Sequence, residues 1–213
     1  MTAPERMPKG IAALRIDRRG YPVPWFVADV DGKPDFRIAD AKKLHRAVVE
    51  GRCWVCGRRF TGPAYARTYA FVVGPMCGVN RTSSEPPSHW DCAEYSATHC
   101  PFLIDPARRR GKAHVPEEVL EPGGVMIERN PGVALVWATR QFNPVILPNG
   151  MIFKFGPPAR VAWFAEGRPA TRAEVSESVR SGLPALEAMA REDGLEACHA
   201  LERQVIALME LAP

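Results

Sequence analysis

Two short motifs of soft metal ligands, far apart in the chain, constrain this sequence more than any other feature. The first is Cys53-x-x-Cys56, followed by Gly57, and the second is His89-x-x-Cys92. Two thiolates three residues apart can face one ion through a tight turn, which a glycine permits. If both motifs bind the same ion, the chain must fold so that two distant segments meet.

The second motif is predicted to open a helix that runs from about His89 to Thr98. Ser88 is the expected N-cap, and Asp91 stands three residues later, where a capping box has its acidic residue. Ligands three residues apart in the first turn lie on one face, where the helix dipole favours a thiolate. A tetrahedral shell without an open position predicts one structural zinc ion, Zn2+, held by Cys53, Cys56, His89 and Cys92.

The six cysteines of the chain are better explained by metal binding than by disulfides. No apolar run approaches the roughly 20 residues of a membrane span, and residues 1–19 lack the apolar core of a signal peptide. We therefore expect a cytoplasmic protein with no membrane partner, in a compartment that keeps thiols reduced. Free thiols packed as small hydrophobic residues are the alternative. Cys77 or Cys100 could also replace His89 or Cys92 as a ligand, whereas Cys198 is expected in the core.

A cysteine knuckle, a hairpin and a helix that supplies the second ligand pair resemble the arrangement of the treble-clef zinc fingers. The resemblance covers residues 52–103 and implies a structural zinc lobe. Four sequence words also resemble those of uncharacterised proteins from bacteria and their phages, for which no activity is established: Cys53-Trp54-Val55-Cys56-Gly57, Gly74-Pro75-Met76, Glu85-Pro86-Pro87-Ser88-His89 and Cys100-Pro101-Phe102-Leu103.

The pattern of the whole chain predicts a single α+β domain that spans residues 1–213. Its composition, 46% hydrophobic and 24% charged, is that of a globular protein. We expect a treble-clef zinc lobe at 40–103, a small, mostly antiparallel sheet at 120–166 and a C-terminal helical hairpin at 171–213. The apolar stripe of the hairpin is expected to pack on the sheet.

Local signals place the elements within this outline. Asp40 is expected to cap a helix that stops at Gly51, and Thr171 to cap a helix that is interrupted near Pro184. Residues 65–73 are expected to form a strand paired with 58–60, and 74–87 to form a loop. Further strands are expected at 25–30, 125–127, 133–137, 151–155 and 161–164.

The charge distribution favours an anionic partner for most of the chain. The net charge is +4, but residues 171–213 hold four arginines against eight acidic residues, so the remainder carries +8. Basic side chains that could contact phosphates of nucleic acid flank the ligand motifs. They are Arg58, Arg59, Arg67, Arg81, Arg108, Arg109, Arg110 and Lys112.

We expect a binding protein rather than an enzyme, namely a zinc-binding accessory or regulatory protein that acts on nucleic acid or its machinery. A protein–protein interaction module, such as an inhibitor or adaptor with a structural zinc, is the first alternative. A degenerate HNH-like nuclease is the second, but no histidine lies between Phe60 and Val73 to act as its general base. Cys77 in a glycine-rich loop is a weaker candidate nucleophile, and no P-loop, GxGxxG or GxSxG motif is present.

Overall fold

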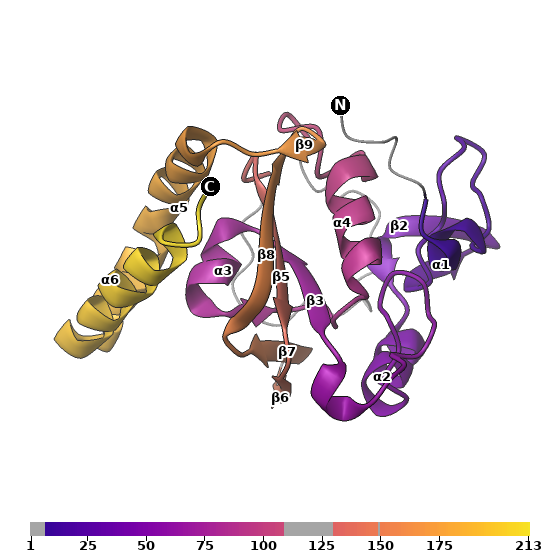
Figure 1. The fold of residues 1–213 in the computed structure, drawn as a ribbon, viewed down its shortest axis with the longest axis horizontal. Helices are drawn as coiled ribbons and strands as arrows, with labels where there is room; N and C mark the ends of the chain where they lie inside the picture. Colours follow the sequence, from indigo (N-terminus) through magenta and orange to yellow (C-terminus); the bar gives the residue numbers. More distant parts are fainter. Residues whose placement is uncertain (1–6, 109–129, 149) are drawn as a thin grey trace.

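The computed structural model describes residues 7–108, 130–148 and 150–213. Within these ranges the chain has an α+β fold in which every strand pairing is antiparallel. A central sheet stands between a C-terminal helical hairpin on one side and helix α4 with the cysteine-rich N-terminal part on the other (Figure 1). The predicted α+β class, with a Cys/His lobe, antiparallel sheets and a C-terminal helical hairpin, is confirmed.

The N-terminal part begins with α1 (Lys9–Ala12) and a two-stranded hairpin of β1 (Val27–Val30) and β2 (Lys33–Ala39). Asp31 and Gly32 turn this hairpin with φ of 51° and 74°, the positive values that a two-residue turn of this kind requires. Helix α2 (Ala41–Val49) follows, and the side chain of its N-cap, Asp40, accepts hydrogen bonds from two backbone amides. The expected strand, turn and cap are therefore confirmed.

The remaining strands form two sheets rather than the one that was expected. The central sheet has the order β3-β5-β8-β9, from Tyr69–Val73, Ala134–Thr139, Pro158–Ala165 and Arg168–Pro169. The second sheet has the order β4-β7-β6, from Thr82–Ser83, Gly150–Phe155 and Phe142–Leu147. All six residues of β5 are buried, as expected for a strand that is covered on both faces.

Strand β5 separates two apolar clusters because its side chains alternate between the faces of the sheet. Leu135 and Trp137 face the larger cluster, which includes residues of the helical hairpin and of the second sheet. Ala134 and Ala138 face the smaller cluster, where Ala93 and other residues of α4 (Trp90–His99) pack against the sheet. Small residues on both surfaces let α4 approach the sheet closely, and this fixes the position of its N-terminal end.

The hairpin consists of α5 (Arg172–Asp193) and α6 (Leu195–Met209), which pack on the short helix α3 (Pro75–Asn80). A Cβ atom on Gly78 of α3 would lie 2.7 Å from Leu135 Cδ2 and 3.1 Å from Leu208 Cδ1. This glycine therefore lets α3 fit between the sheet and the hairpin. The indole of Trp163 also donates a hydrogen bond of 2.9 Å to the carbonyl of Leu211, which ties the end of the chain to the sheet.

Several expected elements are wrong, and each has a physical reason. Strand β3 does not pair with 58–60 but with β5, since only a long apolar partner covers its buried side chains. The expected loop 74–87 contains α3 and β4, because a proline is favourable in the first turn of a helix. Strand β6 contains Pro144 and was missed, and α5 continues through Pro184. Residues 125–127 lie outside the described ranges, and the predicted domain limits stay a prediction.

Candidate metal centre

The first ligand pair lies on a tight knuckle that follows helix α2. The amide of Gly57 donates to the carbonyl of Cys53 over 2.8 Å, and the Cys53 amide donates to the carbonyl of Arg58 over 2.8 Å. Gly57 adopts a φ of 72°, and a Cβ atom there would lie 2.5 Å from Cγ of Trp25. The amide of Cys56 donates to Cys53 Sγ over 3.4 Å, so the turn itself draws the first sulfur toward the second.

The second ligand pair lies at the start of α4. His89 is the N-cap and Cys92 lies in the first turn, whereas the predicted N-cap, Ser88, is one residue too early. Ser88 instead forms two backbone hydrogen bonds with Ala70 of β3, of 2.7 and 2.9 Å. No side chain caps α4, so the predicted capping box is absent. The amide of His89 donates to Cys53 Sγ over 3.3 Å, which joins the helix start to the knuckle.

These two segments bring four ligand atoms together, all within 4.8 Å of one another, from Cys53, Cys56, His89 and Cys92. The three cysteines are buried and the histidine is half-buried. Cys56 Sγ lies 3.5 Å from His89 Nδ1. Zinc–sulfur and zinc–nitrogen bonds of about 2.3 and 2.0 Å in a tetrahedron separate these two atoms by about 3.5 Å. The donor set and the spacing therefore fit a single metal ion.

The titratable groups of the cluster have pKa values that are shifted in different directions. Burial raises the pKa of Cys53, but hydrogen bonds with Cys56, Cys92 and His89 outweigh burial and lower it overall. Hydrogen bonds with Cys53 and Cys56 raise the pKa of His89 to about 10, and the same two partners raise the pKa of Cys92. These shifts favour the thiolate form at Cys53 and the protonated form of His89. A divalent cation would displace these protons, so its affinity should decrease at acidic pH.

Neighbouring residues complete the packing around the cluster. A Cβ atom on Gly10 of α1 would lie 2.9 Å from Cys56 Sγ, so only a glycine lets this helix approach the sulfur. Ile11 is buried in the same apolar cluster as the three cysteines. The rings of Phe60 and His89 lie 4.8 Å apart. Sequence reasoning missed Gly10 and Ile11, since no local pattern connects them with ligands more than forty residues away.

The other cysteines lie outside the cluster. Cys77 is exposed on α3, so the glycine-rich segment proposed to carry a nucleophile is a helix. Cys100 ends α4 and lies about 12 Å along the helix axis from Cys92 at 1.5 Å per residue. Cys198 packs against the larger apolar cluster, as expected. Neither Cys77 nor Cys100 therefore replaces a ligand in this structure.

The basic residues predicted to contact nucleic acid lie on separate elements. Arg58 and Arg59 are exposed on the knuckle, and Arg59 lies 3.6 Å from Glu50. Half-buried Arg67 donates from Nε to the carbonyl of Gly62 over 2.7 Å. The remaining predicted positions are distributed as follows: Arg81 is exposed with its guanidinium 5.7 Å from the ring centre of Trp137, Arg108 pairs with Asp105 at 3.3 Å, and Arg109, Arg110 and Lys112 lie outside the described residues.

Comparisons with known proteins give this chain no family. It matches no protein-family model, and no curated protein and no solved structure matches it significantly. Within the described ranges, none of the helices has the length and hydrophobicity that a membrane span requires. The function must therefore be inferred from the metal centre and from the surfaces around it.

Proposed function

We propose that the protein binds one structural zinc ion through Cys53, Cys56, His89 and Cys92. The observation that supports the proposal is the convergence of these four ligand atoms, within 4.8 Å of one another, from two segments of the chain. Three thiolates and one imidazole are the donors that zinc prefers, and four of them fill a tetrahedral shell. No position is left for water or substrate, so the ion serves the fold and not catalysis.

Removal of one ligand tests the zinc proposal. Wild-type protein should contain one zinc ion per chain by elemental analysis, and Cys56→Ala should lose the ion and most of its thermal stability together. Cys77→Ala is the matched control, because this cysteine is exposed on α3 and outside the cluster. It should keep the zinc and nearly the wild-type melting temperature. A metal-free wild-type protein, or a Cys56→Ala variant with unchanged melting, would contradict the proposal.

The zinc-stabilised fold, in this proposal, acts as an accessory or regulatory protein on nucleic acid or on its processing machinery. The chain outside the hairpin carries a net charge of +8. Arg58 and Arg67, which both lie between the two ligand pairs in the sequence, form no ion pair with a carboxylate among the residues that the structure describes. Cations that are not neutralised by a carboxylate are available to phosphate groups.

Salt dependence tests the nucleic-acid part of the proposal. Fluorescence anisotropy with labelled single-stranded DNA, duplex DNA and RNA should show binding at about 50 mM salt that weakens steeply toward about 200 mM, because counterions are released on binding. The absence of binding to all three probes at the lower salt concentration would exclude direct action on nucleic acid.

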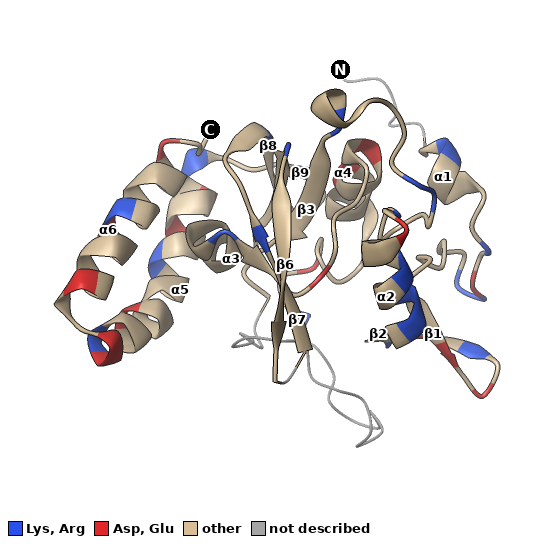
Figure 2. Ribbon diagram, turned by 90° about the horizontal axis from the view of Figure 1, so that it is seen from below, with Lys and Arg blue, Asp and Glu red and all other residues tan. Residues whose placement is uncertain are grey.

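A protein-interaction module is the alternative that one specific observation favours. A groove of about 450 Å³ runs between α5 and α6 and is lined by Leu183, Ala190, Leu201, Val205 and Ile206, among others. Acidic and basic positions are interspersed along these two helices (Figure 2). If the groove receives a partner protein, Ile206→Asp should abolish capture of that partner, whereas Arg67→Gln should not.

A further inference from the structure

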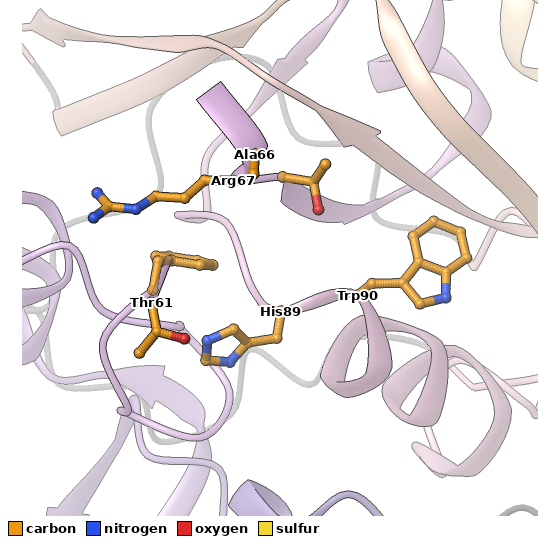
Figure 3. A pocket seen from close by; sticks show the side chains of 7 residues that line it. Thr61, Ala66, Arg67, His89 and Trp90 are labelled. Carbon is orange, nitrogen blue, oxygen red and sulfur yellow. The ribbon is translucent and has the colours of Figure 1, made fainter. Parts of the chain in front are cut away.

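A second site lies directly beside the metal centre. A pocket of about 180 Å³ is lined by Phe60, Thr61, Ala66, Arg67, Thr68, His89 and Trp90. Arg67 and Trp90 point to opposite ends of the pocket, and His89 and Thr61 lie between them (Figure 3). One wall therefore comes from a metal ligand and from the residue that follows it at the start of α4. Metal binding and the shape of this pocket depend on the same few residues.

Arg67 lines the pocket, and two further arginines contact Trp90 and Tyr65, which line it or precede a lining residue. Arg67 is held by the carbonyl of Gly62, and Arg160 of β8 lies 3.8 Å from the ring centre of Trp90. Arg140 donates to the carbonyl of Tyr65 over 2.8 Å. None of the three forms an ion pair with a carboxylate in the described part of the chain, although many other arginines there do.

An acidic residue also lies near the pocket. Glu94 of α4 accepts a hydrogen bond of 3.2 Å from the indole nitrogen of Trp90. Its carboxylate is therefore directed to the edge of the indole, while Arg160 covers the face of the same ring. Two hydroxyl groups, from Thr61 and Thr68, add neutral donors to the lining. Cations and hydroxyl donors form an environment that suits an oxyanion, and the nearby carboxylate of Glu94 is engaged by the indole of Trp90.

Aromatic faces accompany these cations. Tyr65 is 79% exposed, and its carbonyl is bonded to Arg140. Trp90 and Phe60 line the pocket itself. Basic groups that follow a phosphate backbone, next to aromatic rings on which bases stack, are the usual means of binding a single strand of nucleic acid. An inorganic anion would make no stacking contact with the exposed ring of Tyr65, whereas a base could.

We propose that this pocket binds the phosphate group of a nucleotide, free or within a single strand, at Arg67, and that Arg160 adds positive charge at the opposite end, beside Trp90. Tyr65 stacks on the adjacent base. The inference rests on the proposed function, since it identifies where nucleic acid would contact the protein.

The test compares three probes on zinc-loaded, full-length protein: inorganic phosphate, thymidine monophosphate and a labelled oligothymidylate. Arg67→Gln and Arg160→Gln should each weaken binding of the oligothymidylate by about tenfold, and each should reduce the salt slope by about one. Arg203→Gln is the charge-matched control, because this exposed residue of α6 also forms no ion pair among the described residues. It should bind within about twofold of wild type, as expected for a distant surface charge.

Zinc content and melting temperature identify variants that fail to fold, and Tyr65→Ala is a second variant that removes only an exposed ring. This variant should bind the oligothymidylate several-fold more weakly than wild type and should bind inorganic phosphate with unchanged affinity. Oligothymidylate binding that is equal in wild type, Arg67→Gln and Arg160→Gln would overturn the inference but not the proposed function. Binding of thymidine monophosphate alone, lost in both variants, would support the pocket and exclude action on a strand. If none of the probes binds, the pocket proposal fails, whereas the proposed function is decided by the duplex DNA and RNA probes described above.

Discussion

Gly57 shows how a single residue limits the structure of the knuckle. Its φ of 72° is a left-handed value, and the ring of Trp25 fills the place where a side chain would begin. The need for a glycine in this tight turn was predicted from the sequence. The contact with Trp25 could not be predicted, since that residue lies more than thirty positions earlier and no pattern connects the two.

Gly57→Ala should therefore destabilise the protein more than Gly51→Ala. Both glycines have a positive φ, of 72° and 61°, so both substitutions carry the penalty of about 1 kcal/mol for a left-handed alanine. Only at Gly57 does the new methyl group meet another residue, at 2.5 Å from Trp25, whereas nothing lies within 4 Å at Gly51. Urea unfolding of the zinc-loaded variants should show an additional loss of about 1–3 kcal/mol for Gly57→Ala. Equal losses would show that Trp25 moves aside freely.

The cluster of Cys53, Cys56, His89 and Cys92 was predictable from residues alone, because two pairs of Cys and His with a spacing of three usually indicate a shared metal site in a chain of this kind. The exposed arginines were not comparably informative. Whether an exposed arginine can bind an anion depends on which carboxylates lie near it in the folded protein, and tertiary packing decides this. Arg160 and Arg140, which the sequence did not single out, contact Trp90 and the carbonyl of Tyr65, whereas the predicted Arg108 is paired with Asp105.

At the scale of elements, helix starts were predicted better than helix interiors. Asp40 and Thr171 cap α2 and α5 as expected, because a cap is a local hydrogen bond. Helix α3 and the passage of α5 through Pro184 were missed, since tertiary packing overrides the preferences of glycine and proline there. Gly182 is such a case: a Cβ atom on it would lie 2.9 Å from Met76 Cγ, so α5 needs this glycine to pack on α3.

The capping box of α5 predicts a pH dependence. Glu174 accepts from Thr171 and pairs with Arg168 at 2.6 Å, and these partners lower its pKa from 4.5 to about 2. A lowered pKa means that the stabilisation is complete above about pH 4.5 and is lost as the pH falls toward 2. NMR titration of the Glu174 carboxyl group should show no inflection above pH 4. An inflection near 4.5 would show that the capping box is open in solution.

At the scale of the whole molecule, the pairing of β3 with β5 joins residues that are 62 to 70 positions apart. No spacing or turn signal encodes such a contact. The sequence therefore favoured the nearest strand candidate, 58–60, as the partner of β3, and this prediction was wrong. The docking of the hairpin was easier to predict. Its apolar stripe could only be buried against the rest of the chain, and Leu201 and Leu208 are indeed in the larger cluster.

This docking can be measured with two residues of α6. Leu208 is 2% exposed and lies next to Gly78 of α3, whereas Ile206 is 61% exposed on the same helix. Leu208→Ala should reduce the free energy of unfolding by about 2–5 kcal/mol, because it leaves a cavity between α6 and α3. Ile206→Ala should change it by less than about 0.5 kcal/mol. Similar values for the two variants in urea unfolding would indicate that the hairpin is not docked in solution.

The order in which the paired segments leave the ribosome gives the metal centre a further importance. Strand β3 emerges between the two ligand pairs, but its partner β5 begins only at Ala134. Until then, the buried aromatic side chain of Phe71 has no sheet to cover it. Cys92 is already available, so a bound ion would hold the first half of the nascent chain in place during this interval. Cells starved of zinc should therefore accumulate this protein in aggregates formed during synthesis, rather than as a folded chain that merely lacks its metal.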